Sequence, residues 1–562
     1  MGGDDSIADI LKRIYGPLVG TEALVRIMPM LDASPMKKRG QAGFFSNSDA
    51  VLITYGDSLN HPGEYPLATL DRFAREYLRP AFSAIHVLPF FPYSSDDGFS
   101  VTDFFAVNPK LGGWDDIGRL GRNFELMADL VVNHISSQSD WFRRYLDRKP
   151  GFEDLALEAD PGQDLSGVIR PRTTPLLTPY RKTDGRTVHV WTTFSDDQID
   201  LNYRSPGVLE KMIDVLLFYV RQGVSLIRLD AIAYLWKEIG TSCIHLPQTH
   251  DMVRLFRAVL DRVAPDTVIV TETNVPHAEN IAYFGNGRDE AQMVYNFTLP
   301  PLLLHAFVRR DATMLTRWAR ELTLPSDQTA FFNFTASHDG IGVRPLEGIL
   351  PETEIAALVG HVRAGGGYVS CRRSADGSEA PYELNITYVD ALNGPDDGDA
   401  VRAARFLASQ AVGLVLPGVP GVYIHSLLGS RNWHEGGGLT GRARTVNRRP
   451  LAADEVLREI LTPGTLRHRI FHPYVRMLAI RRQQPAFHPN AGFEVLDLSP
   501  RCFAVRRFCE DQNLLALTSV SGEGMSLDLS GLGSPVFRDL ITGTIFDSGN
   551  IRLPPFGFLW LA

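Results

Sequence analysis

The sequence has 562 residues, too many for one ordinary compact domain but suited to a large catalytic unit with an appended domain. Charged residues make up 22% of the chain, and its net charge of −9 comes without a dominant basic region, which argues against nucleic-acid binding. The start, MGGDDSIADILKRIYG, does not resemble a signal peptide, and no apolar run approaches the roughly 20 residues that span a bilayer. Four scattered cysteines favour reduced thiols, so we expect a cytoplasmic protein with no membrane partner.

Short apolar runs alternate with amphipathic stretches along most of the chain. The runs are VLITYG (51–56), AIHVLPF (84–90), LMADLVVNH (126–134), LIRLDA (226–231), VIVTETN (268–274), MVYNF (293–297), FFNFTASHD (331–339) and GVPGVYIHSLLG (418–429). Several are almost continuously apolar, as parallel strands covered on both faces are, while stretches such as 208–223 have helical periodicity. Eight such strands separated by helices predict an α/β fold, a (β/α)8 TIM barrel.

Two connections are too long for simple loops, and the pattern changes near the C-terminus. Residues 135–200 and 345–415 are expected to form inserted subdomains, because loops of this length in a compact fold are usually functional. Beyond about residue 485, runs such as FEVLDL, CFAVRRF and LLALTSV read as short strands. We therefore expect a barrel over 1–134 and 201–484, an insertion after the third strand over 135–200, a long loop insertion over 345–415, and a small antiparallel β domain over 485–562.

Polar residues stand at the ends of four of the apolar runs. In a (β/α)8 barrel the functional groups lie at the C-terminal ends of the strands. One Asp after a strand is usually a cap or turn residue. Burying several charged groups in such places costs free energy unless they are paired or solvated in a site. Together they therefore predict one shared active site. The residues are Asn133, His134, Arg228, Asp230, Glu272, His338 and Asp339.

Two carboxylates with different protonation states can cleave a glycoside, one ionised near the anomeric carbon and one protonated near the leaving oxygen. Arg228 lies two residues before Asp230 on one strand, so both side chains face the same way and the guanidinium favours an ionised Asp230. Glu272 has mostly apolar neighbours, which favours the raised pKa of a general acid. Asp339 is better suited to holding sugar hydroxyls near the reacting centre.

The strand-end segments resemble those of a known family. DLVVNH (129–134), IRLDA (227–231), VTETN (270–274) and SHD (337–339) resemble the four catalytic-strand motifs of glycoside hydrolase family 13, the α-amylase family. QIDLN (198–202) is similar to that family's further motif after the third strand. The resemblance implies Asp230 as nucleophile, Glu272 as general acid/base and Asp339 as transition-state stabiliser. It also implies that His134, Arg228 and His338 hold the donor glucose.

Within the family, the chain is most similar to sucrose phosphorylase and its relatives, in which phosphate replaces water as the second acceptor. LPFFPYSSDDGFSVTDF (88–104), RPRTTPLLTPY (170–180), PYELNITYVDAL (381–392) and RTVNRRP (444–450) carry this resemblance. It implies a glucose-binding Asp96 and an aromatic platform at Phe99. It further implies that 345–415 lies on the acceptor side and that the substrate site includes Phe194, Tyr234, Asn274, Tyr382, Glu383 and Arg444.

Phosphate must approach two carboxylates, which requires nearby cations and the exclusion of water. We expect Arg172, Arg344 and Arg444 to bind phosphate or the acceptor. From the residues alone, Arg172 is equally compatible with a surface ion pair. Inorganic phosphate is then a co-substrate, and no cofactor is expected. Many amylases bind calcium at the position of Asn133, but the phosphorylases generally do not, so we expect Asn133 to bond locally and no metal to be bound.

Two departures from the sucrose-specific pattern argue against sucrose as the substrate. Sucrose-specific members carry His at the position of Asn274 and Gln at that of Glu383. The chain is more similar to the branch that holds the sucrose 6-phosphate and glucosylglycerate phosphorylases, with segments such as WKEIGTSCIHL (236–246) nearest to the latter. We expect reversible phosphorolysis of a small α-glucoside, first of all 2-O-α-D-glucosylglycerate, to α-D-glucose 1-phosphate and D-glycerate.

Several alternatives remain open at the level of sequence. The substrate could instead be sucrose 6-phosphate, glucosylglycerol or sucrose. A hydrolase or transglucosidase would use the same double displacement, and one barrel hosts many activities. A domain that has lost catalysis and serves as a binding module would lack a carboxylate, whereas Asp230, Glu272 and Asp339 are all present. The oligomeric state is not predicted.

Overall fold

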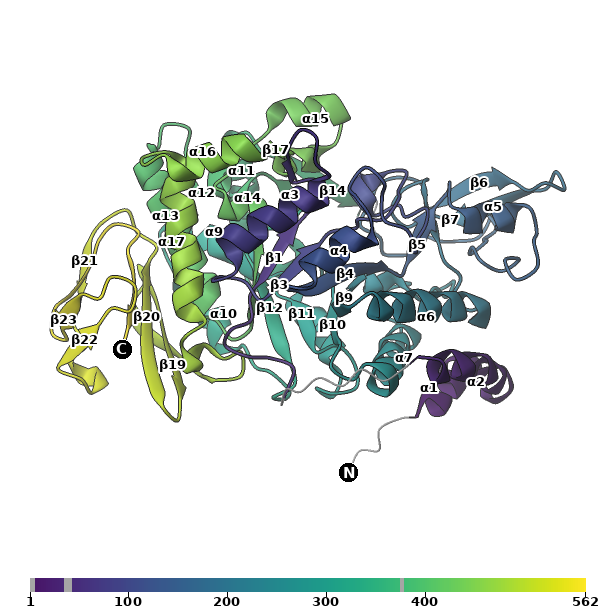
Figure 1. The fold of residues 1–562 in the computed structure, drawn as a ribbon, viewed down its shortest axis with the longest axis horizontal. Helices are drawn as coiled ribbons and strands as arrows, with labels where there is room; N and C mark the ends of the chain where they lie inside the picture. Colours follow the sequence, from purple (N-terminus) through teal and green to yellow (C-terminus); the bar gives the residue numbers. More distant parts are fainter. Residues whose placement is uncertain (1–5, 35–42, 374–378) are drawn as a thin grey trace.

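The computed structural model describes residues 6–34, 43–373 and 379–562. Eight parallel strands close into a barrel at the centre of the molecule (Figure 1). In order around the barrel they are β1 (Val51–Thr54), β16 (Val419–Tyr423), β12 (Ala330–Phe334), β11 (Met293–Tyr295), β10 (Val268–Thr271), β9 (Val224–Asp230), β4 (Glu125–Val131) and β3 (Ala84–Val87). These strands coincide with the eight apolar runs to within a few residues, so the predicted barrel is confirmed.

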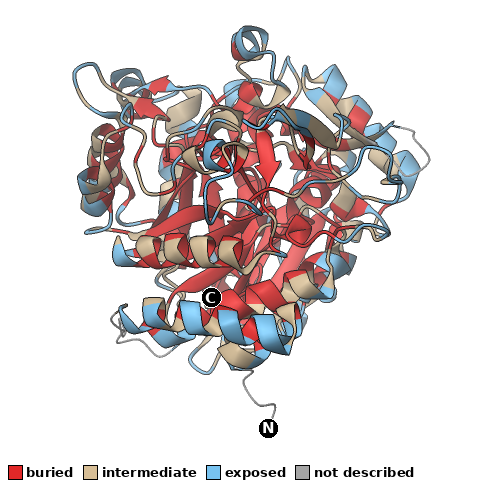
Figure 2. Ribbon diagram, turned by 90° about the vertical axis from the view of Figure 1, so that its right-hand side faces the viewer, coloured by how far each residue is buried: buried red, intermediate tan, exposed pale blue. Residues whose placement is uncertain are grey.

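The barrel strands are apolar because they are buried on both faces, and helices cover their outer side (Figure 2). In α6, apolar residues recur every three or four positions and face the barrel, and Pro206 occupies the first turn, where its missing N–H costs nothing. The helices between successive strands are α3 (Pro66–Phe73), α4 (Trp114–Leu120), α6 (Pro206–Arg221), α7 (Pro247–Val263), α8 (His277–Ile281), α9 (Leu299–Arg309), α10 (Thr313–Arg320) and α13 (Asp399–Val415).

Two segments beyond the C-terminal ends of the strands build the surroundings of the barrel mouth. Between β4 and α6 lie β5 (His134–Ser136), α5 (Asp140–Leu146), β6 (Leu177–Arg181), β7 (Thr187–Trp191) and β8 (Gln198–Asp200). β5 pairs antiparallel with β8, and β6 pairs with β7. Between β12 and α13 lie β13 (Ile341–Gly342), α11 (Glu352–Ala364), β14 (Tyr368–Arg373), β15 (Glu379–Asn385) and α12 (Tyr388–Leu392). Strands β13 and β14 both pair antiparallel with β15.

The ends of the chain add a helical hairpin and a β domain. α1 (Ile7–Tyr15) and α2 (Pro17–Asp32) pack beside α7, at the lower right of Figure 1. After α16 (Ala453–Leu461) and α17 (Leu466–Arg481), the strands β18 (Gly492–Ser499), β19 (Cys502–Cys509), β20 (Gln512–Ser519) and β25 (Phe558–Leu561) form an antiparallel sheet. The predicted C-terminal antiparallel sheet is thereby confirmed. Within the described ranges, no helix combines the length and the apolar composition needed to cross a bilayer.

The β domain is joined to the barrel by buried arginines. Arg507, on β19, donates to the carbonyl oxygens of Val415 at 3.0 Å and His488 at 2.6 Å. Arg481, at the end of α17, donates to the carbonyls of Leu414 and Phe487 at 2.9 and 3.1 Å. Arg507 thus joins β19 to the C-terminal end of α13, and Arg481 joins α17 to α13 and to the segment that precedes the sheet.

Candidate functional site

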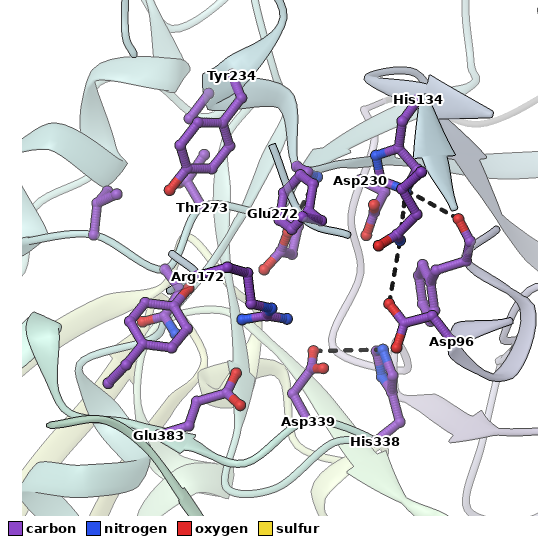
Figure 3. A pocket seen from close by; sticks show the side chains of 18 of the residues that line it. Asp96, His134, Arg172, Asp230, Tyr234, Glu272, Thr273, His338, Asp339 and Glu383 are labelled. Carbon is purple, nitrogen blue, oxygen red and sulfur yellow. Dashed lines mark hydrogen bonds and ion pairs between the residues drawn. The ribbon is translucent and has the colours of Figure 1, made fainter. Parts of the chain in front are cut away.

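A pocket opens at the C-terminal ends of the barrel strands, with about 680 Å³ of empty space including its open mouth. Figure 3 shows Asp230, Glu272 and Asp339 pointing into it, with Asp96 and His134 on one side and Tyr234 and Glu383 on the other. The structure brings together every predicted site residue except Asn133 and Arg344, which do not line the pocket. The lining residues are Asp96, Phe99, His134, Arg172, Phe194, Gln198, Arg228, Asp230, Ala231, Ala233, Tyr234, Glu272, Thr273, Asn274, Val275, Phe297, His338, Asp339, Tyr382, Glu383 and Arg444.

A buried guanidinium links three carboxylates at the floor of the pocket. Arg228 and Asp230 lie two residues apart on β9 and face the same way, as predicted, and Arg228 Nη1 donates to Asp230 Oδ1 at 2.7 Å. The same nitrogen donates to Asp129, which is opposite Arg228 in the register of β4 and β9. Arg228 Nη2 lies 3.9 Å from Glu272 Oε2. Sequence reasoning missed Asp129, although an acid within the apolar run LMADLVV was a signal of a buried partner.

Asp230 and Glu272, both beside Arg228, differ in their electrostatic surroundings. Burial raises the pKa of Asp230, and Arg228 and His134 oppose this increase, so the arginine limits the shift without reversing it. Burial also raises the pKa of Glu272, to about 7; Arg228 opposes the increase, while the negative charges of Asp230 and Asp339 add to it. From the described residues, Glu272 accepts one hydrogen bond, from the neutral Ala231 amide at 3.1 Å. The proton is therefore held more readily by Glu272 than by Asp230.

Asp339 lies beyond β12 and is surrounded by cations. Arg444 Nη1 is 2.7 Å from Asp339 Oδ1, and Arg448 Nη2 is 3.7 Å from the same oxygen. Burial alone would raise the pKa of Asp339, but Arg444, His338 and Arg448 outweigh it and hold the pKa well below its usual value. Arg444 also forms a fork with Glu383, at 3.0 Å through Nε and 2.6 Å through Nη2. Asp339 is thus a firmly ionised carboxylate, and most of the charge of Arg444 is already neutralised.

One wall of the pocket combines rings with polar groups. The His338 ring stacks on Phe99 with centroids 4.8 Å apart and an interplanar angle of 6°, and its Nε2 lies 3.4 Å from Asp339 Oδ2. His134 Nε2 is 3.0 Å from the Phe99 carbonyl. Gln198, which was not predicted as a site residue although it begins the QIDLN motif, donates through Nε2 to Asp96 Oδ2 at 3.2 Å. This wall has the flat apolar surface and the hydrogen-bonding edge that a sugar ring requires.

One carboxylate outside the pocket holds two of its loops together. Asp197 accepts hydrogen bonds from the hydroxyls of four serines, Ser94, Ser95, Ser100 and Ser137. The first three belong to the loop after β3, and Asp96 and Asp97 in that loop have positive φ angles of 53° and 51°. Non-glycine residues adopt this backbone conformation only at a cost in free energy, which the surrounding contacts must offset. Asp197 therefore fixes the backbone that presents Asp96 and Phe99, and its neighbour Gln198, to the pocket.

The opposite side of the pocket is aromatic and carries an unpaired cation. Arg172 lies 5.8 Å above the Phe194 ring and donates only to the Pro171 carbonyl, at 3.3 Å; no described carboxylate is within ion-pair distance of it. The surface ion pair that the sequence left open for Arg172 is therefore absent from the described residues. Tyr234 packs against Phe194 at 5.6 Å. Arg344 lies outside the lining, next to this side, where its Nε is 3.8 Å from Glu347 Oε1.

Comparison with known proteins identifies the family. A model of the α-amylase catalytic domain matches residues 76–339. The chain is 50% identical over 526 residues to the glucosylglycerate phosphorylase of Spirochaeta thermophila, covering 92% of this chain and 89% of that protein. It is 46% identical over 557 residues to the glucosylglycerate phosphorylase of Escherichia coli, covering 99% of both chains. The chain belongs to the α-amylase family.

The solved structures agree with this assignment. The crystal structure of sucrose 6F-phosphate phosphorylase from Thermoanaerobacter thermosaccharolyticum is similar with a TM-score of 0.75 and 25% identity, covering 92% of this chain and 100% of that one. The family membership and the barrel, which the strand-end motifs predicted, are confirmed by these relatives and by the fold.

The position at which many members of the α-amylase family hold calcium does not fit a metal ion here. Lys237 Nζ lies 2.6 Å from Asn133 Oδ1 and 2.7 Å from Asp200 Oδ2, and Asp200 also accepts from the Thr193 amide and hydroxyl. The ammonium thus neutralises the carboxylate that a cation would use. Lys237 is itself buried, with 4% of its surface exposed. Among the described residues, no group of three or more His, Cys, Asp and Glu side chains could hold a metal ion.

The serine cluster around Asp197 yields a prediction. Asp197→Ala should lower kcat/KM for any α-glucoside donor about ten- to hundredfold, because the loop bearing Asp96 and Phe99 loses its anchor and small displacements of positioning groups are costly. Steady-state kinetics measure this loss, and circular dichroism checks the fold. The matched control is Asp164→Ala, which removes an exposed carboxylate that accepts only from Ser166. Equal activity of the two variants would contradict the anchoring role.

Proposed function

We propose that this chain is a retaining phosphorylase that converts 2-O-α-D-glucosylglycerate and phosphate reversibly to α-D-glucose 1-phosphate and D-glycerate. The observation that carries the proposal is its near full-length similarity to two glucosylglycerate phosphorylases, at 46–50% identity. The pocket supports the same reaction class, because its carboxyl groups have the different protonation preferences that a double displacement needs. An inactive binding module is disfavoured, because all three carboxylates are present and converge.

In the first step, the Asp230 carboxylate would attack the anomeric carbon as the bond to the glycerate oxygen breaks. Glu272 would donate its proton to that oxygen, leaving a glucosyl ester on Asp230 and free glycerate. In the second step, a phosphate oxygen would attack the anomeric carbon, the ester bond would break, and Glu272 would accept the phosphate proton. Two inversions retain the α configuration, and both carboxylates return to their starting states.

The other pocket residues support binding roles. Phe99, His338, His134 and Asp96 would hold the glucose ring, since they form the wall beside Asp230. Arg228 would keep Asp230 oriented and limit its protonation, while Asp339 would accept bonds from sugar hydroxyls that strengthen as the ring distorts. Arg172, with no described carboxylate partner, is free to meet phosphate or the glycerate carboxylate. Arg444, by contrast, is neutralised by Asp339 and Glu383, so it would orient those groups more than it would bind an anion.

The substrate is tested by product analysis. Purified protein is incubated with glucosylglycerate, sucrose 6-phosphate, glucosylglycerol or sucrose, each with and without phosphate, and glucose 1-phosphate and free glucose are measured. We expect phosphate-dependent glucose 1-phosphate release mainly from glucosylglycerate. Release of free glucose regardless of phosphate would instead indicate a hydrolase with the same carboxylates, and preference for another glucoside would reassign the acceptor.

The roles of Asp230 and Glu272 are separable with two substrates. Asp230→Asn should reduce turnover of every donor by at least about 10³-fold, because no glucosyl ester can form. Glu272→Gln should impair glucosylglycerate cleavage about 10²–10⁴-fold but spare α-glucosyl fluoride, whose leaving group needs no proton. The matched control is Asp196→Asn at an exposed position near the site. Equal losses on both donors in Glu272→Gln would rule out its role as the acid.

Glu272 also predicts a pH dependence. Its proton is required in the first step and is lost as the pH rises through its pKa of about 7. We therefore expect kcat/KM for glucosylglycerate to fall above about pH 7, whereas kcat/KM for α-glucosyl fluoride stays level. In a double displacement, kcat/KM for the donor reports the first step alone, so the titration of phosphate does not enter. A parallel decline for both donors would place the titrating group elsewhere.

A further inference from the structure

The acceptor side of the pocket carries more positive charge than its own carboxylates neutralise. Arg372 on β14 donates through Nη2 to Glu347 Oε1 at 3.2 Å, and Arg344 Nε lies 3.8 Å from the same oxygen. Two guanidinium groups therefore share one carboxylate. Arg172 nearby has no carboxylate partner among the described residues. Among the described residues, these three cations thus have one carboxylate partner, Glu347, whose side chain is 43% exposed.

Local structure places these arginines beside the pocket. Arg344 follows Val343, whose amide donates to the Tyr382 carbonyl at 3.1 Å. Arg372 pairs with Ala380, two residues before Tyr382 on the same strand. Both arginines therefore lie on segments that adjoin Tyr382, which lines the pocket. Burial raises the pKa of Tyr234 to about 12, while Arg344, Arg172 and Arg372 all lower it, which agrees with a location of the three charges around the Tyr234 hydroxyl.

The two shared guanidinium groups are incompletely satisfied. The Nε atoms of Arg344 and Arg372 are both buried and have no hydrogen-bond partner. Their side chains are 11% and 23% exposed, so their remaining donors are partly accessible without being freely solvated. Partly desolvated guanidinium groups bind planar carboxylates and phosphates strongly, because their donors match the oxygen geometry. A bound anion would stabilise such a site, because it supplies the negative charge that the neighbouring carboxylates do not provide.

We propose that Arg372 and Arg344 form, with Arg172, an anion subsite that takes the carboxylate of the glycerate acceptor in one half-reaction and phosphate in the other, with Glu347 as the resident counter-ion. This inference rests on the proposed function and adds Arg372 and Glu347 to it. It explains how one acceptor side can serve two different anionic partners: both present oxygens to the same guanidinium groups. Glu347 limits the repulsion among the arginines while the subsite is empty, and it competes with the incoming anion.

The test compares acceptors that differ in their charge. Glucosyl transfer from α-glucosyl fluoride, a donor without phosphate or carboxylate, is measured to D-glycerate and to glycerol. Arg372→Gln should raise KM for glycerate about tenfold or more, since a charge-assisted bond is lost, and change KM for glycerol less than about twofold. Glu347→Gln should lower KM for glycerate about threefold, because the competing carboxylate is gone. Arg363→Gln, the same change at an exposed position on α11, should alter neither.

Each outcome decides the point. Opposite shifts in glycerate KM for Arg372→Gln and Glu347→Gln, with glycerol unaffected, support the subsite. Equal changes for both acceptors, or no change for glycerate in a folded Arg372→Gln protein, overturn it. If Arg372→Gln does not fold, an unchanged or raised glycerate KM in Glu347→Gln overturns it alone. Failure of the wild-type protein to release glucose 1-phosphate from glucosylglycerate refutes the proposed function separately, because the fluoride assay does not depend on phosphorolysis.

Discussion

The buried guanidinium of Arg228 is the interaction on which the catalytic pocket depends. Moving a charge of this size out of water costs several kcal/mol, and only direct pairing offsets the cost. Arg228 obtains that pairing from Asp129 on one side and Asp230 on the other, through the register of β4 and β9. The barrel thus fixes the position of Asp230 through its own hydrogen bonding. Without Arg228, two carboxylates would be buried together with no cation between them, and at least one would take up a proton.

Around this centre the charge environment differs from one carboxyl group to the next. Glu272 is 3.9 Å from Arg228, so burial dominates and raises its pKa to about 7. Asp339, by contrast, is closely paired with Arg444 and remains ionised. On the acceptor side, the arginines outnumber the carboxylates that pair with them among the described residues. These environments match what a double displacement needs: a nucleophile, an acid, a stabiliser of positive charge at the sugar, and a place for an anion.

The sequence predicted the barrel and the residues at its strand ends because both depend on local pattern. Apolar runs mark strands that are covered on both faces, and charged residues at their ends stand out against that background. Contacts between distant segments leave no such mark. Nothing near Lys237 in the sequence reveals its partners Asp200 and Asn133. Similarly, nothing near Asp197 indicates that it accepts hydrogen bonds from serines in a loop about a hundred residues earlier. Likewise, the position of Arg344 outside the pocket lining is set by the antiparallel strands β13 and β15.

The distribution of charge also bears on why phosphate, and not water, would complete the reaction. Water needs no cation to reach a glucosyl ester, whereas phosphate must overcome the negative field of Asp230 and Asp339. An acceptor side with excess positive charge raises the local concentration of phosphate and lowers the free energy of its approach, while giving neutral water no comparable advantage. The aromatic side chains of Phe194, Tyr234 and Tyr382 line the same side and reduce the room for loosely held water. In this view, the carboxylates that cleave the glycoside are common to the family, and the choice of second nucleophile lies in the arginines around them.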